Sequence, residues 1–369
     1  MRPTSFLLAF VLLSVTTAGL RAQDVHFTLH DYNPLWLNPA QTGAFSGSVR
    51  VGGIYRGQWY TLNGLSTPSA YVDAPILKGF RDKDWIGVGA NLISDKAGAG
   101  GDLPLKSNYF GFSAAYHLAL DDDRRNVFTL GAQYGSTAIS LDIENPNLVQ
   151  QLTIDPSLGG GGLSQGELRP EGQGGGGSDG ESYTDINAGV MYRSLLDEAK
   201  GNRLEVGVSL IHLNSPKRGT LLPGSSDTTQ VDSTTLGPRA GDDERRRRPT
   251  LHGHARLDLE LSEDWRFQPS IFVQSSAGVT TASLQAWASR ALKPQVNLRM
   301  GLGYRLADAA QVLVGLDYEQ FRAALSYDIT LSDKRTVTNY QGGFELSAAY
   351  IINIYKKPSV VPTMLCPKL

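Results

Sequence analysis

The sequence predicts an all-β protein: an antiparallel transmembrane β-barrel of outer-membrane type, with about 14 strands. From about residue 48 to residue 355 it repeats segments of roughly ten residues in which apolar and polar side chains alternate, each followed by a turn. An export signal precedes these segments, and no later apolar stretch is long enough for a membrane helix. Alternation with a period of two gives each strand one apolar and one polar face. A barrel needs this pattern, with lipid outside and a polar lumen inside.

Residues 1–22 are predicted to be a signal peptide. Arg2 supplies positive charge, Phe6 to Val15 form an apolar core, and small residues lead to Ala22 before Gln23. The apolar core is too short to span a bilayer comfortably. An uncleaved anchor is the alternative interpretation.

Composition excludes some classes and fits the barrel. The net charge is −2, so the chain lacks the basic surface of a general nucleic-acid-binding protein. The 41 glycines suit tight strand bends, and the 15 tyrosines suit the membrane–water boundary. The mean hydropathy of −0.21 is low for a helical membrane protein but fits a barrel with a polar lumen. Cys366 is the only cysteine, so it has no internal disulfide partner, and its position near the C-terminus rules out a lipoprotein anchor.

Residues 23–47 are predicted to be a periplasmic N-terminal segment that docks rather than hangs free. It contains two Asn-Pro steps, Asn33-Pro34 and Asn38-Pro39, which favour extended or turn conformations at both asparagines. Leu35 to Leu37, between the two steps, are too apolar for a free tail. Two interpretations stay open: the segment packs against the lower mouth of the barrel or a partner, or it is a plug that seals the lumen.

Residues 48–355 are predicted to form the barrel. Alternation is clearest in Val49 to Trp59, in Leu251 to Leu261 and in Phe321 to Leu331. The predicted strands are 48–61, 67–77, 85–96, 105–120, 126–141, 182–194, 203–215, 249–262, 265–276, 279–292, 296–306, 310–318, 320–331 and 340–355. Their number is even, as in single-chain bacterial barrels.

The lengths of the connections predict the orientation. If the first strand runs outward, the long insertions 142–181 and 216–248 both lie outside the cell, and the short turns at 121–125, 195–202 and 262–264 face the periplasm. Outer-membrane barrels combine long external loops with short internal turns. Both termini, including a C-terminal tail at 356–369, are then expected in the periplasm.

The two insertions differ in composition. The first contains glycine runs at 159–162 and 174–177 and is expected to be mobile. The second ends in four arginines at 245–248, interpreted as a solvated rim facing anionic lipopolysaccharide, with binding to nucleic acid or an anionic polymer as the alternative.

No motif predicts catalysis. The sequence lacks a Gly-x-Ser-x-Gly elbow, a His-Glu-x-x-His pair and a phosphate-binding loop, so neither an enzyme nor a cofactor is expected. His252 and His254 share one strand face and could chelate a metal, but no third ligand is apparent. We interpret them as lumenal histidines in a hydrogen-bonded network. Asp121 to Asp123 lack calcium-loop spacing and are interpreted as a periplasmic turn.

Several motifs together resemble a known family. Asn38-Pro39-Ala40-Gln41-Thr42-Gly43 is followed by the strand Tyr55-Arg56-Gly57-Gln58-Trp59. Later come Tyr318-Glu319, Leu325-Ser326-Tyr327-Asp328, Gly342-Gly343-Phe344-Glu345-Leu346-Ser347 and the ending Cys366-Pro367-Lys368-Leu369. In this order they resemble the PorP/SprF family of the Bacteroidetes type IX secretion system. The long insertions, and the residues that follow the last strand, depart from the family pattern.

The resemblance implies an outer-membrane accessory of type IX secretion that supports secretion or surface anchoring of adhesins or gliding-motility proteins. The implied partners are periplasmic or lipoprotein components of that system, a secreted cargo, and outer-membrane lipid and lipopolysaccharide. The residues expected to bind a partner are Asn33, Pro34, Leu35, Trp36, Asn38, Pro39, Tyr55, Arg56 and Trp59. A diffusion porin or transporter is the main alternative, and a barrel hydrolase is a more distant one.

Overall fold

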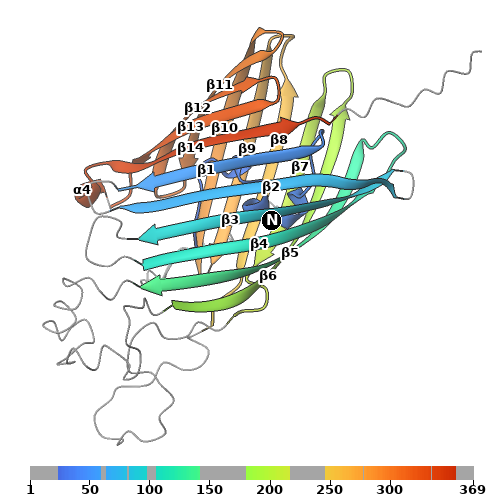
Figure 1. The fold of residues 1–369 in the computed structure, drawn as a ribbon. Coiled ribbons are helices and arrows are strands. Elements are labelled where there is room, and N and C mark those ends of the chain that lie inside the picture. The colour runs from blue at the N-terminus through green and yellow to red at the C-terminus, as the bar shows by residue number, and fades with distance from the viewer. Residues whose placement is uncertain are drawn as a thin grey trace, which may run out of the picture.

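The structure, a computed structural model, is a closed antiparallel barrel of fourteen strands (Figure 1). It describes residues 24–59, 64–80, 83–97, 105–141, 180–216, 246–276, 278–333 and 335–354. The strands are β1 (Val49–Gln58), β2 (Leu65–Phe80), β3 (Asp84–Ala97), β4 (Leu105–Ala119), β5 (Asn126–Leu141), β6 (Gly180–Asp197), β7 (Asn202–Ile211), β8 (Thr250–Glu260), β9 (Trp265–Ser276), β10 (Val279–Lys293), β11 (Val296–Arg305), β12 (Ala309–Tyr318), β13 (Phe321–Thr330) and β14 (Gln341–Ile352).

Every strand pairs with its sequence neighbours, and β1 pairs with β14 to close the sheet. In this last pair Val49 lies opposite Ile352 and Gln58 lies opposite Gly343. Closure satisfies backbone groups that a free sheet edge would leave unpaired, which is why closed barrels can span a bilayer. The predicted fold class and strand number are confirmed.

Each of the predicted strands overlaps an observed strand, and two strands that end earlier than predicted do so for a local cause. The strand predicted at 203–215 ends at Ile211, because His212 adopts a φ of 59° that breaks the extended backbone. The strand predicted at 48–61 ends at Gln58 for the same reason, since Trp59 has a φ of 54°. Left-handed backbone at a residue other than glycine marks a turn that composition alone does not reveal.

The two faces of the sheet are as unlike as the alternation predicts. Large apolar side chains such as Phe112, Met300 and Leu302 are exposed on the outside, while polar ones such as Gln311 and Glu345 are buried inside. In the described ranges, no helix has the length and apolar character needed to cross a membrane.

The barrel has two mouths that we name by their connections. At the insertion mouth, β5 ends at Leu141, β6 begins at Gly180, β7 ends at Ile211 and β8 begins at Thr250. Both long insertions leave from this one mouth, as the sequence predicts, although 142–179 and 217–245 lie outside the described residues. A short helix, α4 (Arg335–Thr338), connects β13 to β14 at the same end.

The opposite end, the turn mouth, contains the starts of β1 and β7 and the ends of β6 and β14. Asp121 begins the predicted periplasmic turn there and accepts hydrogen bonds from the backbone N–H groups of Arg125 and Asn126. Asp121 to Asp123 therefore form a turn between β4 and β5, as expected.

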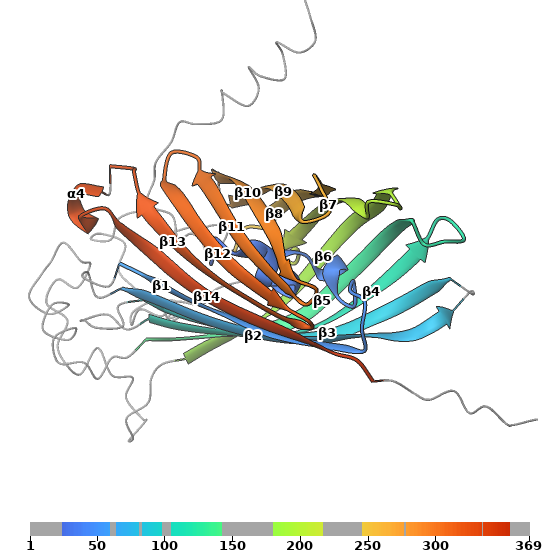
Figure 2. The same cartoon turned by 90° about the horizontal axis from the view of Figure 1, so that it is seen from above.

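Residues 24–48 pass through the lumen and carry three short helices: η1 (His30–Tyr32), α2 (Pro34–Leu37) and η2 (Pro39–Gln41). Figure 2 shows these helices, in blue, enclosed by the barrel wall. We call residues 24–43 the lumenal segment. The plug interpretation of this segment is therefore the one that the structure supports.

The lumenal segment separates the two described ends of the chain. Asp24 contacts Arg247 and Thr250 at the insertion mouth, whereas Ile352 pairs with Val49 at the turn mouth. Asp24 therefore lies at the mouth opposite to the start of β1, and the expectation that both termini lie in the periplasm stays a prediction. The predicted tail 356–369 and signal peptide 1–22 lie outside the described residues.

The outer face generates a test of membrane insertion. Met300, near the middle of β11, and Leu261, after β8, have similar exposed fractions of 57% and 66%. Arginine at the bilayer midplane costs roughly 2–4 kcal/mol, and almost nothing in water. We expect Met300→Arg to lower the free energy of unfolding in lipid vesicles by that amount, and Leu261→Arg to leave it unchanged. Equal effects of the two substitutions would contradict a lipid-facing β11.

Candidate functional site

The two Asn-Pro steps shape the lumenal segment. Pro34 starts α2 and Pro39 starts η2, where a missing backbone N–H costs nothing. Asn38 caps η2, because its Oδ1 accepts a hydrogen bond from the Ala40 N–H at 2.9 Å. Its Nδ2 donates to the backbone oxygen of Val190 at 3.0 Å, so the same side chain ends one helix turn and fixes it to β6.

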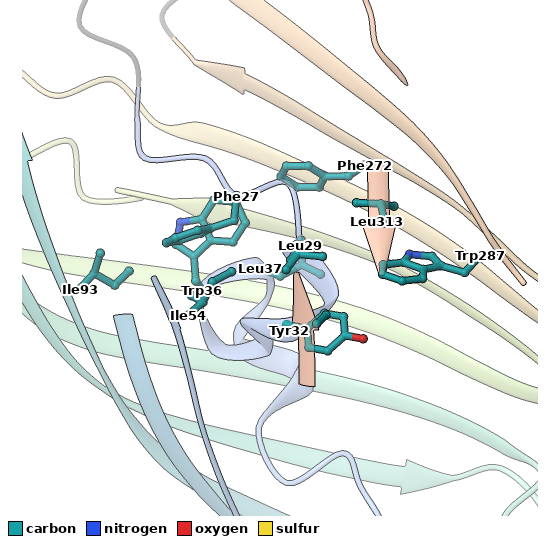
Figure 3. Packing of buried hydrophobic residues seen from close by; sticks show 11 residues of the cluster. Phe27, Leu29, Tyr32, Trp36, Leu37, Ile54, Ile93, Phe272, Trp287 and Leu313 are labelled. Carbon is teal, nitrogen blue, oxygen red and sulfur yellow. The ribbon is translucent and has the colours of Figure 1, made fainter. Parts of the chain in front are cut away.

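Apolar side chains from the segment and the wall form one core inside the barrel (Figure 3). Leu35 and Leu37 are completely buried. Trp36 packs edge-on against Phe27, with ring centroids 5.1 Å apart, and lies 5.6 Å from the ring of Phe272 in β9. Burying these side chains supplies the apolar driving force that holds the segment in an otherwise polar lumen.

Glycines in the wall let the segment approach closely. A Cβ on Gly131 in β5 would overlap the backbone of Pro39 and Ala40, and one on Gly189 in β6 would overlap the side chain of Asn38. A Cβ on Gly87 in β3 would likewise overlap the backbone of Thr42. These lumen-facing glycines therefore form a recess for η2 and the residues after it.

A buried cluster of charged side chains holds the first part of the segment. We call Arg56, Arg305, Asp328 and Glu345 the Glu345 cluster. Glu345 accepts hydrogen bonds from the backbone N–H groups of Thr28 and Leu29, both at 2.7 Å. Arg56 forms ion pairs with Glu345 and Asp328. The cluster thus binds the backbone of the turn before η1, and its arginines neutralise the carboxylates that accept these hydrogen bonds.

The wall holds Thr28 through both its backbone and its hydroxyl group. Its hydroxyl donates to Asp328 at 2.8 Å, and its carbonyl oxygen accepts from the Gln285 side chain at 2.7 Å. Arg305 donates to Asp328 at 2.9 Å and completes the charge balance. The backbone and hydroxyl groups of Thr28 are therefore all satisfied by the barrel.

Three of the motifs that carry the sequence resemblance meet at this cluster. Arg56 comes from the Tyr-Arg-x-Gln-Trp strand, Asp328 from Leu-Ser-Tyr-Asp and Glu345 from Gly-Gly-Phe-Glu-Leu-Ser. Arg305, Asp328 and Glu345 were not among the site residues predicted from the sequence. For Asp328 and Glu345 the available signal was a charged residue on the lumenal face inside a motif, since an unpaired charge there would be costly. Arg305 lies in none of the motifs.

A second group of side chains, the Asp73 cluster, holds the end of the segment near the turn mouth. It comprises Arg50, Asp73, Trp85, His117 and Arg193. Asp73 accepts from the Gly43 N–H at 2.7 Å and from Arg50 at 2.8 Å. The three remaining side chains bond the backbone oxygens of Thr42, Gly43 and Ala44: His117 at 2.8 Å, Trp85 at 3.1 Å and Arg193 at 2.7 Å.

Asp24 anchors the segment at the insertion mouth. It forms an ion pair with Arg247 and accepts a hydrogen bond from Thr250. Burial would raise the pKa of Asp24, but hydrogen bonding to His212 and the charge of Arg247 outweigh it and hold the pKa below its usual range. His212 also bonds Asp185 at 2.6 Å. The segment is thus fixed at both mouths and at the Glu345 cluster.

The two predicted lumenal histidines belong to a hydrogen-bonded network, as expected. His252 Nδ1 lies 3.2 Å from the Leu37 carbonyl oxygen, and His254 Nε2 lies 3.2 Å from Asn38 Nδ2. Both therefore contact the lumenal segment. Among the residues that the structure describes, no three His, Cys, Asp or Glu side chains are grouped to hold a metal ion.

The predicted partner-binding residues have different surroundings. Asn33, Pro34, Leu35, Trp36, Asn38, Pro39 and Arg56 are buried in the lumen. Tyr55 faces outward beside Phe344. Trp59 follows β1 at the insertion mouth, where its backbone N–H donates to the backbone oxygen of Gly342. A partner could contact the buried residues only if the segment left the lumen, so partner binding stays a prediction.

Comparison with known families gives a match over most of the chain. The family model described as "Type IX secretion system membrane protein PorP/SprF" matches residues 20–350. No curated protein matches the sequence.

Solved structures with a similar fold include the Ralstonia pickettii toluene transporter TbuX. It has a TM-score of 0.48 and 11% identity, over 88% of this chain and 94% of that one. The P. putida toluene transporter TodX has a TM-score of 0.46 and 12% identity, over 87% of this chain and 93% of that one. A Pseudomonas aeruginosa FadL homologue has a TM-score of 0.44 and 12% identity, over 85% of this chain and 92% of that one.

The Glu345 cluster makes a testable contribution to stability. Glu345→Gln removes a buried charge next to Arg56 and turns one acceptor for a backbone N–H into a donor. Breaking a buried ion pair costs about 3–5 kcal/mol. We expect a loss of that size in the free energy of unfolding, with faster amide hydrogen exchange at Thr28 and Leu29. The exposed Glu263→Gln is the control, and equal effects of the two changes would contradict the role of the cluster.

The glycine recess has a matched test. A Cβ on Gly131 would overlap η2, whereas a Cβ on Gly253 in β8 would have no atom within 4 Å. Because overpacking costs about 1–3 kcal/mol, we expect Gly131→Ala to destabilise the protein by that amount and to speed amide exchange across residues 38–43. Gly253→Ala should do neither. Identical exchange in the two variants would show that η2 does not rest on β5.

Proposed function

The chain belongs to the PorP/SprF family of type IX secretion system membrane proteins, and on that premise we propose that it is a plugged outer-membrane barrel that serves this system as an accessory. In this role it supports secretion or surface anchoring of adhesin or gliding-motility cargo. The barrel acts as a platform rather than as the conduit for the cargo.

One observation carries the proposal: the lumen is occupied along its length by the chain's own N-terminal segment. The segment is bonded at the insertion mouth through Asp24, in the lumen through Thr28, and at the turn mouth through Gly43. An open conduit would need an empty lumen. A platform needs only a stable, closed body with two different mouths.

We further propose that the insertion mouth faces the cell exterior, because outer-membrane barrels place their long loops there. The start of the segment at Asp24 then lies toward the exterior, and the end of β14 lies toward the periplasm. Cargo would meet the insertion mouth, and periplasmic or lipoprotein components would meet the turn mouth.

The Asn-Pro residues enter this proposal with a condition. Asn33, Leu35 and Asn38 are wholly buried, so they can bind a partner only in a state in which the segment has left the lumen. Leaving exposes apolar side chains and breaks the bonds to Glu345 and Asp73. A partner that binds them must therefore supply more interaction free energy than these contacts give.

The alternative, a diffusion porin or transporter, requires the same segment to move or to leave a continuous path beside it. The buried side chains of α2 and η2, which contact β3, β4, β5 and β6, speak against such a path. Conductance measurements separate the two functions.

Deletion of residues 24–44 tests the proposal. We expect the shortened barrel to insert, because its strands and their closure are intact, and the cargo on the cell surface to fall severalfold. Surface cargo can be measured by antibody binding to intact cells, with Gly253→Ala as a control whose segment stays packed. Normal surface cargo in cells with an inserted, segment-free barrel would contradict the role of the segment in secretion.

The same deletion separates the accessory from the porin. In a planar bilayer we expect the intact protein to stay closed and the deletion variant to conduct, since the segment fills the lumen. Steady conductance by the intact protein would favour a porin instead.

A further inference from the structure

A pocket lies beside the lumenal segment, on the side of the insertion mouth. Its floor and sides are mainly apolar and include Val25 and Trp36 from the segment, with Ile93, Tyr109 and Ile211 from the wall. The segment thus supplies one side of the pocket, and the barrel supplies most of its lining. A pocket with apolar sides and few polar groups is the usual form of a small-ligand site.

Among the described residues, Asp95 is the carboxylate of the pocket that forms no ion pair. It lies on β3 near the insertion mouth, lines the pocket and accepts a hydrogen bond from Thr67 at 2.6 Å. In the described part of the chain, no Lys, Arg or His forms an ion pair with it. The neighbouring guanidinium groups of Arg56 and Arg247 are bound by Glu345 and Asp24. Asp95 therefore keeps a carboxylate oxygen for a cation.

The charge of the pocket points the same way. Asp24 and Asp95 line it together with one arginine, Arg247. Asp185 lies behind His212 at 2.6 Å and adds a third carboxylate. Among the described residues, Asp24 and Asp185 lie within ion-pair distance of Arg247 or His212, whereas Asp95 forms no ion pair, so the carboxylate of Asp95 is the one that can attract a further cation.

A buried amide gives the pocket a hydrogen-bond donor in addition to the carboxylate of Asp95. The backbone N–H of His212 donates to the Asn187 side chain, which donates to the Gln133 side chain. Gln133 in turn donates to Asn91 Oδ1 at 2.9 Å. This chain fixes the orientation of each amide. Within the described ranges, Asn91 Nδ2 has no hydrogen-bond partner, although Asn91 lines the pocket and is only 2% exposed. A buried donor of this kind is costly unless an oxygen acceptor meets it.

We propose that this pocket binds an alkylammonium or guanidinium ion on an apolar stem that carries an oxygen acceptor at its far end. Asp95 receives the cation, Ile93 and Tyr109 contact the stem, and Asn91 donates to the acceptor. Asn91, Ile93 and Asp95 lie at alternate positions of β3. The groups that bind the acceptor, the apolar stem and the cation therefore follow one another along one strand. A free amine and a lysine or arginine of a peptide share this chemistry.

The inference is independent of the proposed role in secretion and is tested in vitro. We would titrate the full-length protein in detergent at low ionic strength and follow binding by calorimetry. The probes are 6-amino-1-hexanol, which has the cation, stem and acceptor; hexylamine, which lacks the acceptor; and 1-hexanol, which lacks the cation. We expect the first to bind at least tenfold more tightly than 1-hexanol, with hexylamine between them.

Two variants locate the site. Asp95→Asn should weaken 6-amino-1-hexanol at least tenfold, while Asp317→Asn, a lumenal carboxylate near the turn mouth, should have no effect. Asn91→Leu should reduce 6-amino-1-hexanol to the affinity of hexylamine. Equal binding of 1-hexanol, tighter binding of hexanoate, or insensitivity to Asp95→Asn would each overturn the assignment.

A further arm identifies the source of the ligand. Nα-acetyl-lysine methylamide presents the same cation and stem from a peptide unit. Binding as tight as that of 6-amino-1-hexanol would support a peptide side chain, and much weaker binding would support a free amine. Binding of neither probe would overturn the proposal.

Discussion

The capture of two consecutive backbone N–H groups by Glu345 is the interaction on which the lumen depends. A segment whose helices are only three or four residues long brings unpaired backbone groups into a space with little water, and each must find a partner. Glu345 supplies two acceptors, but a buried carboxylate is itself costly without a counter-charge. Arg56 neutralises it, Asp328 balances Arg56, and Arg305 balances Asp328. The Glu345 cluster therefore exists as a set, because each member requires the next.

The same requirement explains the other features of the wall. A barrel of this size encloses more space than its own side chains fill, so the lumen must hold water, a ligand or a part of the chain. Here apolar side chains around Trp36 exclude water, and glycines such as Gly131 leave room for the backbone of the segment. Asp73 binds the N–H of Gly43 as Glu345 binds those of Thr28 and Leu29. The result is a closed body whose two mouths are linked by one continuous segment.

Sequence patterns predicted the barrel well because they follow from local chemistry. Alternation predicted all fourteen strands, and the lumenal positions of His252 and His254 followed from it. The Asn-Pro steps predicted a docked segment, yet could not decide between the lumen and an outside surface. The apolar side chains between the two steps would be buried in either place. The position of Asp24 at the insertion mouth was also missed. It depends on contacts with Arg247 and Thr250, more than two hundred residues away in the sequence.

The site was only partly predictable for a related reason. Arg56 stood out because it lies in a recognisable motif, but its partners on β13 and β14 become neighbours only when β1 closes the barrel against β14. Tyr55, in the same motif, points to the opposite face, because adjacent strand positions alternate. A motif therefore identified the right strand without identifying which of its side chains act together.

The most direct test of the central claim, that the segment occupies the lumen of the folded protein, is disulfide trapping between Thr42 and Ser113. Their hydroxyl oxygens lie 2.8 Å apart, one on the segment and one on β4. In a Cys366→Ser background, the double variant Thr42→Cys with Ser113→Cys should form an internal disulfide in intact membranes and run with altered mobility without reductant. Absence of that disulfide, with both cysteines open to a thiol reagent, would contradict a lumenal segment.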